Sequence, residues 1–102
     1  MAIMQGTTPI HTFKLPFDTS IIKTVRIIYS QCGKKLFSRE GDQVRRSENI
    51  IETTLTQEET FKIDPENIVE IQIRIIDNAN NAANTRIMRV SAEKCLETEV
   101  LE

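Results

Sequence analysis

The side chains that most often carry out catalysis are few in this sequence of 102 residues. His11 is the only histidine, so a general base or a multi-histidine metal site would depend on one residue near the N-terminus. Its place in the first extended segment favours an ordinary surface histidine. Cys32 and Cys95 are the only cysteines, and two thiols cannot complete a tetrahedral zinc site.

The two cysteines are expected to be free thiols. A bridge between Cys32 and Cys95 is geometrically open, but a reducing cytoplasm disfavours it. Cys32 precedes Gly33 in an expected turn and has no histidine close to it in the sequence. We therefore interpret it as an ordinary turn cysteine and not as a reactive thiol.

Acidic residues gather in one part of the chain, at Glu58, Glu59, Asp64 and Glu66. Paired carboxylates can serve general acid–base chemistry or bind calcium, but this spacing lacks the central glycine of a calcium loop. The sequence has only three glycines and contains neither a phosphate-binding glycine-rich loop nor a nucleophile elbow. We expect no cofactor, no metal and no enzymatic activity. A small hydrolase is a further hypothesis, which the lack of turnover on a broad panel of substrates would exclude.

Composition indicates a globular domain with no affinity for nucleic acid or membrane. Apolar residues make up 39% of the chain, charged residues 27%, and the net charge is −2. The basic doublets Lys34-Lys35 and Arg45-Arg46 are interpreted as solvated hairpin positions, because a nucleic-acid footprint needs a larger basic patch. No apolar run approaches the ~18 residues of a membrane helix, and the start lacks a signal-peptide pattern. The expected location is the cytoplasm of the producing cell.

Residues of alternating polarity predict extended strands along most of the chain. The first half gives strands at 10–17, 21–31, 36–39 and 50–56, with a hairpin turn at Gly33 and a loop or frayed edge strand at 40–49. Pro16 suits an edge or a strand end because proline has no amide hydrogen. The second half gives a clear strand at 68–76, a flexible Asn-rich and Ala-rich loop at 77–84 and a last strand at 85–92.

One helical turn is predicted between these halves. Thr56 and Glu59 match a capping box, and Phe61 and Ile63 follow at a spacing that places them in the core. Six to seven short strands with one short helical turn predict an all-β protein, an immunoglobulin-like antiparallel β-sandwich. We expect a single domain at 8–96, a flexible N-terminus at 1–7 and a C-terminal tail at 97–102, whose last two residues have the form of an expression-tag scar.

The Leu-Thr-Gln-Glu-Glu-Thr segment at 55–60 resembles a turn in the immunoglobulin-like N-terminal domain of siphophage upper baseplate proteins. In that family the turn leads into a long alternating strand, a loop and a final strand. The Thr-Phe-Lys-Leu-Pro-Phe-Asp opening at 12–18, followed by the strand at 21–29, is similar to small prophage proteins of Gram-positive bacteria. Together these likenesses cover residues 8–96. They imply a tail, baseplate or other accessory module of a virion, although the larger baseplate proteins continue into further domains.

Two functions follow as hypotheses. The first is a structural or adaptor module whose strand edges, and whose loops around Gly41 and Asn80, bind other phage structural proteins or a second copy of itself. The alternative is a carbohydrate-binding β-sandwich, which needs an exposed aromatic ring. Phe37, on the expected edge hairpin, is the ring expected to serve that role.

Overall fold

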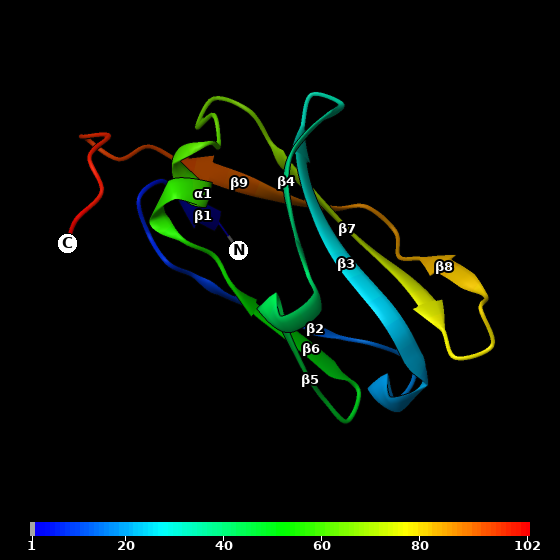
Figure 1. Cartoon of the computed structure of the whole chain (residues 1–102). Helices are drawn as coiled ribbons and strands as arrows, with labels where there is room; N and C mark the ends of the chain where they lie inside the picture. The colour runs from blue at the N-terminus through cyan, green and yellow to red at the C-terminus, as the bar shows by residue number, and fades with distance from the viewer. Residues whose placement is uncertain (1) are drawn as a thin grey trace.

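The computed structural model describes residues 2–102 and shows two β-sheets facing each other (Figure 1). The larger sheet has six strands in the order β1-β9-β7-β3-β4, and β8 pairs with one end of β7. Its strands are β1 (Ala2–Met4), β3 (Ile22–Gln31), β4 (Lys34–Glu40), β7 (Val69–Asp77), β8 (Ala82–Asn84) and β9 (Met88–Glu93). None of the helices within residues 2–102 has the length and apolar content needed to cross a membrane.

The smaller sheet has three strands in the order β2-β6-β5, which are β2 (Ile10–Lys14), β6 (Ile50–Thr54) and β5 (Val44–Ser47). Two single-turn 3₁₀ helices, η1 (Thr19–Ile21) and η2 (Gly41–Gln43), and the short α1 (Gln57–Phe61) complete the fold. All strand pairs are antiparallel except β1 with β9, which is parallel.

The strand order is that of an immunoglobulin-like sandwich. Strands β2, β6 and β5 take the places of B, E and D, and strands β3, β7 and β9 take those of C, F and G. Strand β4 extends the second sheet as C′ does in variable-type domains. The predicted fold class is confirmed. The predicted strand count is too low, because β1, β5 and β8 have only three or four residues, too few for alternation to stand out.

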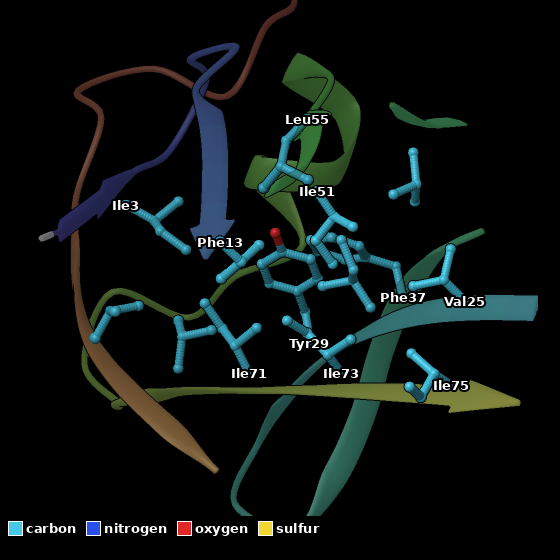
Figure 2. Close-up of a cluster of buried hydrophobic side chains, with 14 of the residues drawn as sticks. Ile3, Phe13, Val25, Tyr29, Phe37, Ile51, Leu55, Ile71, Ile73 and Ile75 are labelled. Atoms are coloured by element: carbon cyan, nitrogen blue, oxygen red, sulfur yellow. The ribbon is translucent and has the colours of Figure 1, made fainter. Parts of the chain in front are cut away.

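Strand β7 is the centre of the larger sheet. Val69, Ile71, Ile73 and Ile75 are buried, and the residues between them face outward. Burial of each such side chain stabilises the fold by roughly 1.5–3 kcal/mol. Figure 2 shows Ile71, Ile73 and Ile75 in the core together with Phe13, Ile51 and Leu55 from the smaller sheet and the segment that follows it.

The β3–β4 hairpin forms where it is predicted, with Cys32 and Gly33 as its two turn residues. Both have positive φ, 52° and 75°, as a type I′ turn requires. Gly33 adopts this conformation without strain, whereas Cys32 carries a Cβ in the left-handed region.

The predicted capping box is confirmed. The Thr56 hydroxyl accepts from the Glu59 amide at 3.1 Å, and the Glu59 carboxylate accepts from the Thr56 amide at 2.9 Å. Ile63 lies in the core as expected, while Phe61 is half-buried against Gly6. A Cβ on Gly6 would lie 2.8 Å from the Phe61 ring, and its φ is +75°, so only glycine fits.

The interpretation of residues 1–7 as a segment outside the domain is wrong for Ala2–Met4. This segment forms β1 beside β9, and the Ile3 side chain is fully buried. Met1 lies outside the described residues. Residues 97–102 have no regular structure, and the Leu101 backbone exchanges two hydrogen bonds with the Gln57 side chain.

Two loop predictions also change. The 40–49 segment contains β5, so the alternative of an edge strand was the correct one. The 77–84 segment is not loop throughout, because Ala82–Asn84 pairs with β7 as β8. Alanine and asparagine have low strand propensity, so backbone pairing with a long neighbouring strand accounts for β8 better than its sequence does.

Candidate functional site

His11 lies inside the sandwich, so the expectation of a surface histidine is wrong. Its side chain is 2% exposed and points from β2 toward the larger sheet. The reason is parity: His11 is two residues before Phe13 and four before Leu15, and alternate residues of a strand face the same side. The strand places an imidazole where the fold needs a core residue.

A hydrogen bond of 2.6 Å joins His11 Nδ1 to the Tyr29 hydroxyl of β3. Tyr29 has no other hydrogen-bond partner among residues 2–102, so donation of its O–H to Nδ1 leaves the fewest groups unpaired. His11 Nε2 then carries the proton and has no partner within the described residues. Burial lowers the pKa of His11. Burial and the Glu59 carboxylate raise the pKa of Tyr29, against a smaller opposite effect of Arg39.

A nearly buried ion pair lies close to this hydrogen bond. The side chains of Arg39 on β4 and Glu59 on α1 are 12% and 14% exposed, and Arg39 Nη1 is 3.1 Å from both carboxylate oxygens. Arg39 also donates to the Thr53 hydroxyl at 3.2 Å and to the Thr54 carbonyl at 2.9 Å. One guanidinium therefore ties an edge of the larger sheet to β6 and to the helix.

The arrangement of these groups favours a structural role. Antibody domains join their sheets with a disulfide against a tryptophan on strand C. Here Tyr29 is on the strand in that place, and both cysteines are free. The contacts of His11 with Tyr29 and of Arg39 with Thr53 and Thr54 each link the two layers. Within residues 2–102 no group of three or more His, Cys, Asp or Glu residues is placed to hold a metal ion.

The burial of His11 predicts an acid-sensitive fold. Its folded-state pKa lies below its ordinary value of 6.5, so the unfolded chain binds the extra proton more readily. The free energy of unfolding should therefore decrease as pH falls below about 6.5. Urea midpoints measured at steps between pH 7.5 and 5.5 test this expectation.

The control for this measurement is His11→Leu, which should show no such decrease above pH 5.5. The pKa values of Asp18 and Glu52 are lowered, by the Ser20 amide and by Arg45 with Thr12 respectively. Their stabilisation is present above their ordinary values of 3.8 and 4.5 and is lost below them, outside this window. An equal slope in wild type and His11→Leu would contradict the assignment.

Phe37 does not offer the exposed ring that the carbohydrate alternative expects. It is 8% exposed and stacks on Tyr29 with ring centroids 4.7 Å apart (Figure 2). Phe37 lies on the inward face of β4, so its ring is part of the core. The expectation of an exposed platform at Phe37 is wrong.

Gly41 and Asn80 are both exposed, in the turns that follow β4 and β7. Gly41 begins η2 with φ +60°, and a Cβ added there would meet nothing within 4 Å. Asn80 has φ +65° and accepts a hydrogen bond of 2.8 Å from Lys23 Nζ. The larger sheet has β3 between the strands that carry these two turns, so the two residues lie at separate places in the fold.

The sandwich has a free backbone edge at β2, which among the strands of residues 2–102 pairs only with β6. Two hydrogen bonds fix which residues of β2 bond to β6: the Leu55 amide donates to the Pro9 carbonyl, and the Leu15 amide donates to the Asn49 carbonyl. The odd-numbered residues of β2 therefore form the hydrogen-bonded pairs with β6. The amides and carbonyls of Ile10, Thr12 and Lys14 therefore point away from the sheet. Those groups are available to an added strand.

An apolar groove runs between this edge and the larger sheet. It consists of two hollows of about 410 and 150 Å³ that share Leu15, Ile73 and Thr85. An apolar cavity of ~150 Å³ accepts a molecule the size of benzene, so even the smaller hollow has room for one aliphatic side chain. The remaining lining residues are Thr12, Phe13, Lys14, Pro16, Phe17, Ile75, Ala83, Asn84, Arg86 and Met88.

The charges along the groove have one sign. Lys14 and Arg86 line it, and neither hollow is lined by an acidic residue. The nearby Glu52 accepts from Thr12 at 3.0 Å and is paired with Arg45 at 3.0 Å. Sequence reasoning missed this site, because its two walls come from strands about sixty residues apart in the chain. The edge position suggested by Pro16 was the available signal.

Comparison with known proteins adds one distant likeness. No family model and no curated protein matches the sequence. The solved V domain of amphioxus IgVJ-C2 is similar at 12% identity and TM-score 0.36, over 91% of this chain and 99% of that chain. These values are too low to carry an argument, so the fold class rests on the strand order.

Proposed function

We propose that this domain is a structural or adaptor module without catalytic activity, which binds an extended segment of a partner protein along the free edge of β2. The observation that carries the proposal is an unpaired strand edge beside an apolar groove. Strand addition of this kind takes affinity from backbone hydrogen bonds and specificity from pockets for alternate side chains. The domain offers both.

Contrast with another edge of the sandwich supports the choice of β2. Strand β5 has four residues and carries Arg45 and Arg46, and short, charged edges discourage pairing. Strand β2 carries Ile10, Thr12 and Lys14 on its outward face, with a single charge. It is therefore the less protected of the two edges of the smaller sheet.

The resemblance at 55–60 and 12–18 supports the more specific part of the proposal, an accessory module of a phage or prophage virion. In that setting the partner is another tail or baseplate protein, and the domain resides in the producing bacterium or the particle. Tail or capsid genes on both sides of the coding sequence would support this setting. Neighbours without such genes would leave only the general adaptor role.

Thr12→Pro tests the site directly. Proline removes the outward amide at the middle of β2 but no hydrogen bond of the β2–β6 ladder, and edge strands tolerate such a proline. From a random decapeptide display library, wild type should select extended peptides. We expect Thr12→Pro to weaken the binding of these peptides at least tenfold, measured by fluorescence anisotropy.

Thr12→Ala is the matched control, because it keeps the amide and should bind peptides as wild type does. Urea unfolding of both variants establishes that each is folded. Absence of any selected peptide, or equal binding by wild type and a folded Thr12→Pro, would overturn the proposed site.

A further inference from the structure

We infer that the groove beside β2 accepts residues 96–100 of a second copy of this chain. This inference rests on the proposed function and names the partner. Such docking links each domain to a neighbour through its C-terminal segment.

The segment has the pattern of a short strand that lacks a sheet. Leu96, Thr98 and Val100 alternate with Glu97 and Glu99, so an extended backbone places the apolar and acidic side chains on opposite faces. The Leu96 side chain is 100% exposed, and Val100 is also exposed. Leu96 therefore lies in water without a covering surface, and Val100 is 38% exposed.

The groove complements the segment in length, polarity and charge. The five residues 96–100 match the five residues of β2 in length. Because side chains alternate along an extended segment, Leu96 and Val100 then face the apolar hollows. The opposite face then carries Glu97 and Glu99 on the side of Lys14, where the nearby Glu52 is already paired with Arg45, and Arg86 lines the groove itself. Opposite charges at the rim fix orientation and accelerate association.

The position of the segment favours a second copy over the same chain. The Gln57 side chain holds Leu101 beside α1, and Figure 1 shows the C-terminal segment at that end, away from β8. The groove is bounded by Ala83 and Asn84 of β8. A domain that offers a donor segment at one end and an acceptor groove at the other makes a heterologous contact, which gives rings or open chains.

Sedimentation velocity of the full chain under reducing conditions tests the inference, since the free thiols of Cys32 and Cys95 must not form intermolecular disulfides. Wild type should show larger species as its concentration rises into the millimolar range. Leu96→Asp should shift the apparent dissociation constant at least tenfold toward monomer. Because Leu96 touches nothing in the monomer, the variant should unfold at the wild-type urea concentration.

Ile68→Asp is the matched control, because it also replaces an exposed aliphatic side chain by a carboxylate but lies outside both the segment and the groove, so it should leave association within about twofold. The synthetic peptide of residues 94–100 is the second probe. It should bind the Leu96→Asp protein, whose groove is vacant, and Thr12→Pro added to that protein should abolish binding.

The outcomes separate this inference from the proposed function. A strictly monomeric wild type, or association unchanged by Leu96→Asp, overturns docking of a second copy. If library peptides still bind in a Thr12-dependent manner, the adaptor role stands with a different partner. Peptide binding by Leu96→Asp with a monomeric wild type would show that the segment occupies its own groove, which also overturns the inference.

Discussion

Replacement of Arg39 by alanine should lower the free energy of unfolding by about 3–5 kcal/mol. Loss of one partner of a nearly buried ion pair leaves the other charge without compensation, which costs this much in other proteins. The Glu59 side chain is 14% exposed and would retain only its capping bond to the Thr56 amide. Urea unfolding followed by circular dichroism measures the difference.

Two controls show whether the buried charge is responsible. Arg45→Ala breaks a pair in which Arg45 and Glu52 are 52% and 37% exposed, so it should change stability little. Arg39→Met combined with Glu59→Gln removes both charges and should cost less than Arg39→Ala alone. Equal effects of Arg39→Ala and Arg45→Ala would contradict the importance of this pair.

The strands that could be predicted from sequence are those long enough to show their period. Nine residues of β7 give four buried positions in alternation, and the β3–β4 hairpin has a glycine at its turn. Strand β1 has three residues and a single buried side chain, Ile3, so no period exists to detect. Its place depends on β9, which is almost ninety residues away in the chain.

The error at His11 has a different cause. Residue type suggested the surface, whereas strand parity placed the side chain with Phe13. The period-two pattern was the better guide, because a one-residue shift would turn every side chain of β2 to the other face. The same holds for Phe37, because its position in the alternation places its side chain on the buried face of β4.

The candidate site could not be predicted from the sequence because it depends on the three-dimensional arrangement of the strands, which leaves one side of β2 without a neighbour. That β2 has no partner on one side follows from the path of β1, which joins the other sheet. That a groove opens there follows from the separation of Leu15 and Ile73 across the two layers. Neither property belongs to any single segment.

The second large effect is expected at Tyr29. Tyr29→Ala removes a fully buried ring that stacks on Phe37 and holds His11, and truncation of a buried aromatic residue costs about 3–5 kcal/mol. Domains of this size have 5–15 kcal/mol of stability, so the variant should be marginal at 37 °C. A lower thermal midpoint, with binding of a hydrophobic dye, is the expected result.

A double-mutant cycle separates the ring from its hydroxyl. Tyr29→Phe keeps the ring but leaves both nitrogens of His11 unpartnered, at a cost of about 1–3 kcal/mol. His11→Leu likewise leaves the tyrosine hydroxyl buried without a partner. The double variant removes every polar atom of the contact and should be less destabilised than the sum of the two, with no loss of stability between pH 7.5 and 5.5. Additive losses would mean that the two side chains act independently, and the hydrogen bond would then not be what joins the sheets in place of a disulfide.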